Sequence, residues 1–356
     1  MREFHPLTVS DIRQETRDSI RIALDVPDEL AEEYRFRPGQ HLPFETEIDG
    51  KKLRRTYSIC SAADQTPIEI GVRVQDGGQF STFAANDLKV GDTLRAMPPS
   101  GRFHVELDPN NAKDYVGFAA GSGITPILSM IKSILATEPN SRFMLFYGNR
   151  KQSSTMFIDD LYALKNQYME RLQLNFVFSQ EEQEFEPMAG RLDGDKVREL
   201  YSHFGQGIRC TDCFVCGPDT MIKDVTDALI DLGMHKDHVH FERFGVPRKT
   251  ATKPAVKLPK AAEHAEVTVI MDGHRQSFDM ERDDANIIDA AADHGIELPF
   301  SCKGGVCATC RCHVQTGEVR MEANFGLEPW EVDAGFVLAC QSRPVSEAVT
   351  LDYDKT

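Results

Sequence analysis

Four cysteines near the end of the sequence have the spacing of thiolates that hold a [2Fe-2S] cluster. Cys302, Cys307 and Cys310 follow the pattern C-x4-C-x2-C, and Cys340 supplies the distant fourth thiolate. A loop with this spacing must wrap two irons while its backbone N–H groups point at the sulfurs. The two glycines after Lys303 suit such a loop, because glycine reaches positive φ and allows a close backbone approach. The sequence therefore predicts a one-electron redox centre on these four cysteines.

A structural zinc site is the alternative interpretation of these cysteines. Zinc ligands usually come in C-x2-C pairs, whereas the first spacing here is four residues. The spacing favours the cluster over zinc. Cys312 lies outside the pattern, and we expect it to be a packed side chain.

The segments around these cysteines predict a small β-grasp domain. Residues 265–280 alternate around an Asp-Gly turn, as in a β-hairpin. Residues 285–295 form an amphipathic helix that Gly295 ends, and the cysteine loop follows directly. We assign residues 264–356 to this α+β domain. Residues 247–263 are rich in Pro, Lys and Ala without hydrophobic periodicity, which indicates an interdomain linker.

A stretch in the first third of the chain has the residue types that a flavin site needs. Within RRTYSIC, residues 54–60, Arg55 and Tyr57 project from the same side of a predicted strand. A cation for a pyrophosphate and a flat ring for an isoalloxazine would then share one face. Ser58 would bring its hydroxyl or its N–H near the flavin N5, and Thr56 is included among the cofactor-binding candidates. A surface strand without a ligand is the alternative.

A second stretch, DGGQFST at residues 76–82, predicts an anion site. A glycine pair precedes a predicted helix, and the exposed N–H groups at a helix start bind phosphate. The residues alone leave FAD and FMN both open. The candidates in this stretch are Gly77, Gly78, Phe80, Ser81 and Thr82.

Residues 1–108, which contain both stretches, predict an antiparallel β-barrel. Short β-suited runs are separated there by turns rich in Pro, Gly and Asp. The runs are Leu7–Val9, Ile20–Leu24, Ile68–Val74 and Thr93–Met97.

From residue 109 the pattern changes to alternating strands and helices, which indicates an α/β domain with a parallel sheet over residues 109–246. The strand Tyr115–Ala119 leads into GSGITP, where Gly121 and Gly123 allow a tight turn and a close approach to a diphosphate. Pro126 falls in the first turn of the following helix, where proline is tolerated. The pattern is neither a Walker motif nor a complete G-x-G-x-x-G. The candidates are Gly121, Ser122, Gly123, Thr125 and Pro126.

The end of the next predicted strand favours NADPH as the dinucleotide. Residues 142–150 end on Asn149 and Arg150, where a fold that binds NAD would carry an acid for the ribose hydroxyls. A cation at this position favours a 2′-phosphate instead. Lys151 and Ser153 could contribute, and a solvated loop is the alternative for both.

A further group of cysteines imitates a cluster motif. Cys210, Cys213 and Cys216 are spaced C-x2-C-x2-C, but an apolar pair between the last two predicts a buried strand. Alternate side chains of a strand point to opposite faces, so these thiols could not converge on one metal. Cys216 instead lies at the carboxyl end of a parallel strand, where ligands bind, and is followed by Gly217 and Pro218.

The last strand of this domain carries two histidines and an aromatic residue. His238 and His240 share a strand face and suggest metal ligation, but we favour a half-exposed strand pair. Phe244 is a candidate aromatic cover for the flavin, with core packing as the alternative.

Composition limits the function further. The 356 residues suffice for two or three domains, and the nine cysteines favour metal ligation over disulfides because no apolar leader precedes them. No run is long enough to span a bilayer, so we expect a cytoplasmic protein. A net charge of −16 makes nucleic acid an unexpected partner. Acidic residues exceed basic ones by about ten from His264 onward, which suits docking to a basic surface or solubility alone.

The chain as a whole resembles the ferredoxin-NADP reductase superfamily with a C-terminal plant-type ferredoxin domain, and within it the reductases of bacterial phenylacetyl-CoA epoxidases. The motifs that carry this resemblance are FRPGQHL at 36–42, RRTYSIC at 54–60, AAGSGITP at 119–126, YGNR at 147–150, CGP at 216–218, HFERF at 240–244, CKGGVCATCRCHV at 302–314 and EANFGLEPWEVDAGFVLACQ at 322–341.

The resemblance implies a path for electrons. Hydride would pass from NADPH to FAD at Ser58, with Cys216 and Glu242 lining the site and with Tyr57 and Phe244 packing the flavin ring. Single electrons would then move to the cluster and on to a di-iron oxygenase that epoxidises phenylacetyl-CoA. The reductase of another oxygenase, of the Rieske or di-iron kind, has the same internal chemistry and stays open as an alternative. A non-enzymatic electron carrier would need only the C-terminal domain.

Overall fold

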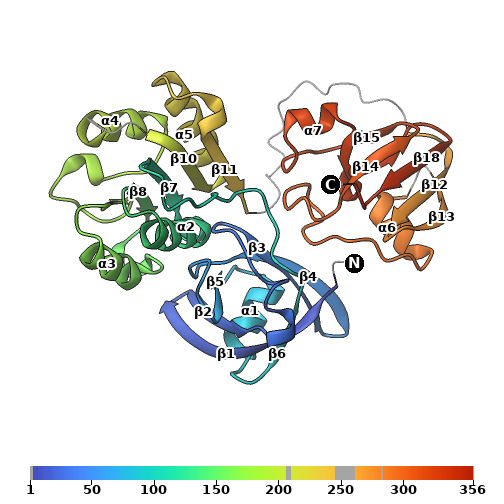
Figure 1. Ribbon diagram of the computed structural model, residues 1–356, viewed down its shortest axis with the longest axis horizontal. Coiled ribbons are helices and arrows are strands. Elements are labelled where there is room, and N and C mark those ends of the chain that lie inside the picture. Colours follow the sequence, from blue (N-terminus) through green and yellow to red (C-terminus); the bar gives the residue numbers. More distant parts are fainter. Residues whose placement is uncertain (1–2, 206–209, 245–260, 282–283, 356) are drawn as a thin grey trace. The chain divides into compact units, whose positions relative to one another are not determined.

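The structure is a computed structural model that describes residues 3–205, 210–244, 261–281 and 284–355 (Figure 1). The chain divides into two compact units, and each is described by itself. The larger unit holds Phe4–Leu53 and Tyr57–Phe244, and the smaller unit holds the C-terminal residues together with Arg54–Thr56. Most of the predicted linker, residues 247–263, lies outside the described residues.

The N-terminal domain is a six-stranded sheet with the order β4-β3-β6-β1-β2-β5. Each of the four predicted runs coincides with one of its strands, and only Val74 and Met97 lie one residue past a strand end. The pairs β1–β2, β1–β6, β2–β5 and β3–β6 are antiparallel. Along β1, the buried Leu7 and Val9 alternate with exposed residues, which is why this segment forms a half-buried strand. The strands are β1(His5–Thr16), β2(Ser19–Asp25), β3(His41–Ile48), β4(Lys51–Ser58), β5(Ile68–Arg73) and β6(Thr93–Ala96), with the helix α1(Gln79–Asn86) after β5.

The predicted antiparallel barrel is present as an antiparallel sheet whose ladder of strands is open between its edges β4 and β5. Only a single isolated bridge, Ile59 to Ile70, joins the end of β4 to β5 among the described residues. The cis peptide before Pro67 and the short turn at residues 61–67 separate the two segments that pair there. The fold is therefore an antiparallel sheet that curls towards a barrel.

The middle domain is a five-stranded parallel sheet with the order β11-β10-β7-β8-β9. Two apolar cores lie on its two faces: α2 and α3 pack in one, and α4 and α5 in the other. Buried residues of β8 alternate between these cores, as expected for a sheet that is covered on both sides. The elements are β7(Asp114–Ala120), β8(Arg142–Asn149), β9(Leu172–Phe178), β10(Cys210–Gly217) and β11(Val239–Arg243), with α2(Ile124–Thr137), α3(Ile158–Gln167), α4(Gly194–Phe204) and α5(Asp219–Asp231).

The C-terminal domain is a five-stranded mixed sheet with the order β13-β12-β18-β14-β16, beside a two-stranded sheet β15-β17. The predicted hairpin is present as β12 and β13, which turn at Asp272-Gly273 with positive φ at both residues. The predicted helix is α6, which ends before Gly295. The elements are β12(His264–Met271), β13(His274–Glu281), α6(Ile287–Asp293), β14(Arg311–Thr316), β15(Val319–Met321), α7(Pro329–Asp333), β16(Phe336–Leu338), β17(Ser342–Pro344) and β18(Ala348–Asp352).

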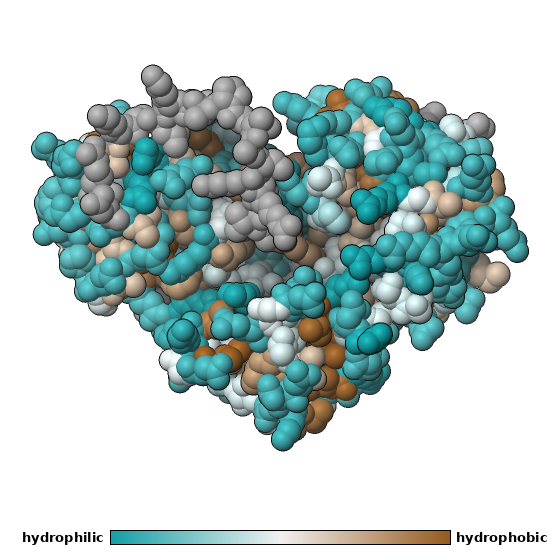
Figure 2. All heavy atoms as spheres, turned by 180° about the vertical axis from the view of Figure 1, so that it is seen from behind, coloured by the Kyte–Doolittle hydropathy of each residue, from teal (hydrophilic) through white to brown (hydrophobic). Residues whose placement is uncertain are grey.

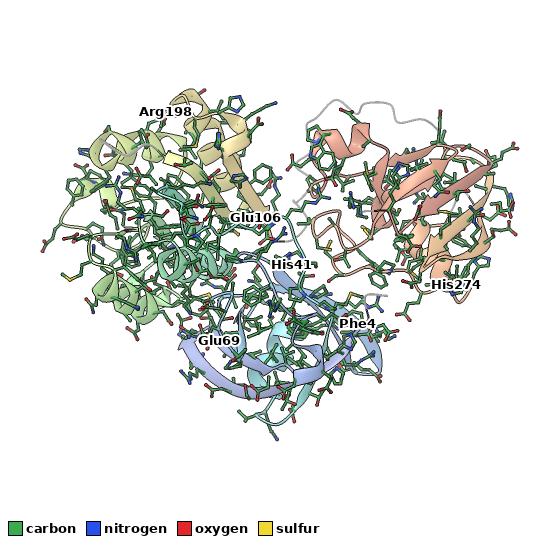
Figure 3. The ribbon with its side chains drawn as sticks, viewed as in Figure 1. Phe4, His41, Glu69, Glu106, Arg198 and His274 are labelled. Atoms are coloured by element: carbon green, nitrogen blue, oxygen red, sulfur yellow. The ribbon has the colours of Figure 1, made fainter. Side chains whose placement is uncertain are left out.

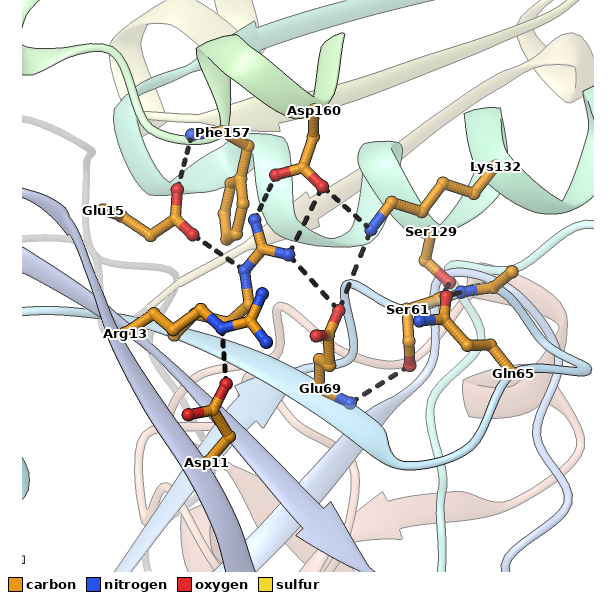
Figure 4. A network of polar contacts seen from close by, with 12 residues as sticks. Asp11, Arg13, Glu15, Ser61, Gln65, Glu69, Ser129, Lys132, Phe157 and Asp160 are labelled. Atoms are coloured by element: carbon orange, nitrogen blue, oxygen red, sulfur yellow. Dashed lines mark hydrogen bonds and ion pairs between the residues drawn. The ribbon is translucent and has the colours of Figure 1, made fainter. Parts of the chain in front are cut away.

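An ion cluster joins the N-terminal and middle domains within the larger unit (Figure 4). Arg21 on β2 binds Glu15 on β1 at 2.7 Å and pairs with Asp160 on α3 through both guanidinium nitrogens. The third partner of Arg21 is Glu69 on β5, at 3.5 Å, and Lys132 on α2 approaches both Glu69 and Asp160 within 4 Å. These five side chains are at most 24% exposed. The cluster therefore couples three strands of one domain to two helices of the other.

Close backbone packing accompanies the ion cluster. A Cβ atom at Gly71 of β5 would lie 2.7 Å from the Thr125 side chain and 2.8 Å from the Phe157 ring, so only glycine fits there. The Ser129 hydroxyl donates to the Ser61 carbonyl at 2.7 Å. The two domains thus meet without an intervening solvent layer at these positions.

Hydrophilic residues cover most of the molecular face drawn in Figure 2, and apolar residues occupy only small areas of it. The described residues include no helix long and apolar enough to cross a membrane.

Candidate functional site

Ser58, Cys216 and Glu242 come from three strands and meet at one place. Glu242 on β11 is the register partner of Cys216 on β10. Ser58 is the last residue of β4, and its hydroxyl donates to Oε2 of Glu242 at 3.2 Å. Burial, and then the Glu242 carboxylate, raise the pKa of the Cys216 thiol well above its ordinary value. A hydroxyl, a carboxylate and a protonated thiol are therefore brought together at the junction of the two domains.

His41 extends this polar chain on the other side of the carboxylate. It lies on β3, is almost fully buried and is labelled in Figure 3. Its Nδ1 is 3.4 Å from Oε1 of Glu242, and its Nε2 has no hydrogen-bond partner in the described part of the chain. A Cβ atom at Gly101 would lie 2.8 Å from Nδ1, so glycine makes room for the imidazole. Sequence reasoning missed His41, because its partner is 201 residues away.

The predicted flavin strand carries its candidates in two environments. Arg55 is exposed, and Thr56 and Tyr57 are partly buried on β4. The Tyr57 ring lies 5.1 Å from that of Phe80, at an interplanar angle of 33°. Phe80 itself is 1% exposed, so it supports Tyr57 from within the core.

The glycine loop before α1 carries the residues of the predicted anion site. Gly78 is the N-cap of α1, and Gly77 has a φ of 74° with open space within 4 Å of the position that a Cβ atom would take. The Ser81 hydroxyl accepts from the N–H of Gln75 and donates to the Gly78 carbonyl, at 3.2 Å each. Ser81 therefore closes the loop, while the exposed Thr82 and the open face at Gly77 remain accessible.

The loop after β7 has a tight turn and packs closely on β10. Gly121 has a φ of 54°, as the predicted tight turn requires, and Thr125 donates to the Ser122 carbonyl at 3.0 Å. A Cβ atom at Gly123 would lie 2.1 Å from the carbonyl oxygen of Cys216. Gly123 thus allows close packing of the loop on β10, whereas the sequence predicts that it approaches a diphosphate. Pro126 is buried in the first turn of α2.

The carboxyl ends of β8, β10 and β11 carry the remaining candidates. Arg150, Lys151 and Ser153 are exposed after β8. Gly217 is partly buried and Pro218 exposed at the start of α5. Phe244 is 45% exposed at the end of β11, so the alternative of core packing is wrong for this residue.

A second cation beside the loop was missed by sequence reasoning. A Cβ atom at Gly121 would lie 3.0 Å from Nη1 of Arg73 on β5, so this guanidinium borders the turn. Asp18 holds it through bonds of 2.8 and 3.2 Å. The strand position of Arg73 gives no sign of this role, because the loop belongs to the other domain.

The cysteine loop of the smaller unit points backbone N–H groups at sulfur. The N–H groups of Gly304 and Cys307 lie 3.3 and 3.4 Å from the Sγ of Cys302. Three residues of the loop have left-handed φ: Lys303 at 49°, Gly305 at 74° and Ala308 at 53°. This folding of the loop is what directs the N–H groups inwards, as a cluster of anionic sulfurs requires.

The four predicted thiols interact two by two. A hydrogen bond from Cys307 lowers the pKa of Cys302 to about 5, and the same contact raises the pKa of Cys307. Cys310 and Cys340 form the second pair, in which the pKa of Cys310 is raised and that of Cys340 is lowered. Among the described residues, no three Cys, His, Asp or Glu side chains are grouped to hold one metal ion. Two thiolates for each of two irons is the donor set of a [2Fe-2S] cluster.

Comparison with known proteins agrees with this geometry. Residues 6–105 match the oxidoreductase FAD-binding domain, residues 118–227 the oxidoreductase NAD-binding domain, and residues 269–345 the 2Fe-2S iron-sulfur cluster binding domain. The chain is 43% identical to a subunit of 1,2-phenylacetyl-CoA epoxidase from Escherichia coli (strain K12), over 99% of both chains. It belongs to the family of phenylacetyl-CoA epoxidase reductases.

More distant relatives share the whole domain order. The ferredoxin reductase component of 3-ketosteroid-9-alpha-monooxygenase from Rhodococcus rhodochrous is 33% identical, over 98% of this chain and 96% of that protein. Among solved structures, phthalate dioxygenase reductase has a TM-score of 0.60 at 23% identity and covers 98% of both chains. A type IV self-sufficient cytochrome P450 monooxygenase has a TM-score of 0.69 at 23% identity, over 98% of this chain and 41% of that one. This member of the epoxidase reductase family is thus an FAD- and NAD-binding oxidoreductase with a ferredoxin domain.

Four further cysteines and histidines of this family member pack in a core or pair with a carboxylate. Cys213 and Cys216 lie in different cores on opposite faces of the sheet, as strand alternation predicted. Cys312 is fully buried in the core of the C-terminal domain. His238 and His240 each lie 3.2 Å from Oδ1 of Asp212, so they pair with a carboxylate.

Proposed function

We propose that this reductase transfers electrons from NADPH through FAD and a [2Fe-2S] cluster to the di-iron oxygenase of a phenylacetyl-CoA epoxidase. The observation that carries the internal chemistry is the meeting of Ser58, Glu242 and Cys216. The 43% identity to a subunit of that epoxidase, over 99% of the chain, supports the choice of this partner. Catalysis would then occur in a cytoplasmic protein with FAD-binding, NADP-binding and ferredoxin domains at residues 1–108, 109–246 and 264–356.

Bound FAD accepts two electrons as hydride and releases them singly, and a [2Fe-2S] cluster accepts one at a time. Ser58 would hold the N5 edge of the flavin with its hydroxyl, because Glu242 already fixes the orientation of that hydroxyl. Tyr57 would pack against one face of the ring, since Phe80 supports it from behind. The half-exposed Phe244 would cover the opposite face until the nicotinamide arrives.

The phosphates would be held by backbone and by arginine. Arg55 and the loop from Gly77 to Thr82 would bind the pyrophosphate of FAD at the start of α1. The turn from Gly121 to Pro126, with Gly217 and Pro218, would bind the dinucleotide. Arg150 would bind the 2′-phosphate, which is why we propose NADPH over NADH.

The nicotinamide would lie beside Cys216. The Cys216 thiol has a raised pKa and stays neutral at physiological pH, so it would add no negative charge beside the nicotinamide. Glu242 would supply charge complementary to the positive nicotinamide that remains. Cys302, Cys307, Cys310 and Cys340 would hold the cluster that accepts the electrons.

The proposal is tested first by spectroscopy. The purified protein should show flavin bands and a broad iron-sulfur absorption, both bleached by stoichiometric NADPH under argon. Ser58→Ala should keep its FAD and slow flavin reduction by NADPH, whereas Ser202→Ala, on the exposed face of α4, should match the unsubstituted protein. A flavin spectrum without cluster bands in fully reconstituted protein would contradict the proposal, and so would equal rates in the two variants.

Another oxygenase as the electron acceptor is the second candidate, because a ketosteroid monooxygenase reductase is similar over 98% of this chain. Turnover with a purified phenylacetyl-CoA epoxidase oxygenase, and none with a ketosteroid oxygenase, would decide for the first candidate. The opposite pattern would decide for the second. A fragment of residues 1–246 should still reduce ferricyanide with NADPH; if it does not, the non-enzymatic carrier becomes the better interpretation.

A further inference from the structure

One exposed apolar surface stands out on the C-terminal domain. Trp330, which is the single tryptophan of the sequence, is 63% exposed, and Val332 is 39% exposed. In the described part of this domain they are the two large hydrophobic residues classed as exposed, and both lie on the short helix α7 (Figure 1). Pro329 and Ala334 are exposed beside them. We call these four residues the α7 patch.

The α7 patch is held by contacts that lead to the cysteine loop. Glu331, between the two exposed apolar residues, is fully buried, and its Oε1 accepts from Nε of Arg311 at 2.8 Å. Arg311 directly follows Cys310, one of the predicted cluster ligands. The N–H of Ala339, next to Cys340, donates to the Cys310 carbonyl at 3.1 Å, and α7 packs on the strand β16 just before it.

The segment that leads into α7 also lies on the cysteine loop. The N–H of Phe325 donates to the Gly305 carbonyl at 2.9 Å. A Cβ atom at Gly326 would lie 2.5 Å from the carbonyl oxygen of Val306, so this contact is too close for any other residue. The α7 patch is therefore rigidly placed next to the loop that would hold the cluster.

The chain segment that carries the α7 patch has charged residues of one sign only. Residues 321–342 contain four acidic residues and no lysine or arginine. Glu328 and Asp333 are exposed at the two ends of α7, whereas the buried Glu331 is neutralised by Arg311. An exposed aromatic anchor with a charged rim is the composition of a binding hot spot, and exposed apolar clusters of this kind mark interaction sites.

We propose that the α7 patch is where the oxygenase component docks to receive electrons, through an apolar pocket rimmed by basic residues. This inference rests on the proposed function. A separate protein that binds from dilute solution depends on a few strong contacts, and aromatic anchors are enriched among such contacts. A domain of the same polypeptide depends less on such contacts, because the linker that joins it already provides an effective concentration of about the millimolar range. Docking here would also bring the acceptor next to the cluster loop, and electron tunnelling falls steeply with distance.

The test compares the full-length reductase with Trp330→Ala, Trp330→Phe and the charge variant Asp333→Lys. Met169→Ala is the matched control, because Met169 is 69% exposed but lies in the middle domain. Two rates are measured for each protein. The first is bleaching of its own cluster absorption by NADPH in anaerobic stopped flow, and the second is NADPH-dependent turnover of the purified oxygenase at increasing oxygenase concentration.

We expect Trp330→Ala to raise the KM for the oxygenase at least tenfold, with bleaching of the cluster unchanged. Trp330→Phe should recover most of the affinity, and Met169→Ala should change neither rate. Asp333→Lys should raise the KM and reduce its dependence on salt, because rim charges steer association. An unchanged KM in Trp330→Ala would overturn the docking proposal, and so would slower bleaching, which would assign the α7 patch to the flavin domain.

Two further outcomes are decisive. A dimer of the reductase that Trp330→Ala dissociates, seen by light scattering at assay concentrations, would make the α7 patch a self-interface and overturn the proposal. If the unsubstituted reductase bleaches with NADPH but supports no oxygenase turnover, the proposed acceptor is wrong and the docking proposal falls with it. Loss of oxygenase turnover in the Trp330 and Asp333 variants alone would leave the proposed function intact. Failure of the docking proposal and failure of the proposed function are therefore distinguishable.

Discussion

Replacement of Arg21 by methionine should destabilise the larger unit strongly, because Arg21 is the centre of the ion cluster. The substitution leaves Glu15, Glu69 and Asp160 in a largely buried place with Lys132 as their remaining cation (Figure 4). Removing one partner of a buried ion pair costs about 3–5 kcal/mol. The side chains are up to 24% exposed, so we take the lower end, about 3 kcal/mol.

This cost predicts a measurable shift in melting temperature. For a folded unit of about 240 residues, 1 kcal/mol lowers the melting temperature by about 2–4 °C, so Arg21→Met should lower it by about 6–12 °C. The assay is the rise in flavin fluorescence when FAD is released on heating, because this signal reports the unfolding of the larger unit, which contains the Arg21 ion cluster. The matched control is Arg13→Met, which removes an arginine that pairs with Asp11 but is 68% exposed. An exposed pair contributes less than about 1 kcal/mol.

The pH dependence gives a second readout of the same substitution. Burial raises the pKa of Glu15, although Arg21 opposes this shift. The folded state therefore holds this proton more tightly than the unfolded chain, and stability is lost as pH rises through the raised pKa. Without Arg21 more stability is lost as pH rises, so the difference in melting temperature between Arg21→Met and the unsubstituted protein should be greater at pH 8 than at pH 5. Equal decreases in melting temperature for Arg21→Met and Arg13→Met would refute the conclusion that the Arg21 ion cluster stabilises the larger unit.

Four other substitutions probe separate parts of the molecule. Cys340→Ala should abolish cluster-dependent cytochrome reduction and keep NADPH–ferricyanide turnover; equal loss of both would contradict the division between flavin and cluster. Arg150→Ala should raise the KM for NADPH about tenfold, the effect of roughly 1.4 kcal/mol, and leave that for NADH within about twofold. Gly123→Ala should cost about 1–3 kcal/mol of stability, because its Cβ would lie 2.1 Å from the Cys216 carbonyl; a normal melting temperature would disprove that contact. Asp212→Asn should cost about 1.5–3 kcal/mol near pH 7. Burial raises the pKa of Asp212, but hydrogen bonds from His240 and His238 outweigh it and lower the pKa. The stability difference between Asp212→Asn and the unsubstituted protein should therefore shrink as pH falls below about 3.8. A stability difference that does not change with pH would contradict the pairing.

Local sequence patterns predicted most of the elements, because strand alternation and helix periodicity are properties of neighbouring residues. The four runs of the N-terminal domain, the helix after Gly78 and the hairpin before α6 were all present where expected. The spacing of Cys302, Cys307 and Cys310 was informative for the same reason, since one short loop carries three of the predicted ligands.

Contacts across domains could not be predicted in this way. Arg21 lies 139 residues from Asp160, and His41 lies 201 residues from Glu242. Each is an unremarkable polar residue on a strand until the other domain supplies its partner. The packing of Gly123 on β10 was not foreseen for a related reason: a glycine that permits close approach does not itself say whether a ligand or another strand approaches.

The two polar clusters of the larger unit have different physical roles. The Arg21 cluster has several partners for each charge, so losing one contact leaves others, and its main effect is on stability. The chain from Ser58 through Glu242 to His41 is linear, with single contacts of 3.2 and 3.4 Å. A small relative displacement of the two domains would therefore break the contacts of Glu242 with Ser58 and His41 before it separated the ion pairs of Arg21. The geometry proposed for hydride transfer therefore depends on a junction that the Arg21 cluster and the close packing at Gly71 keep fixed.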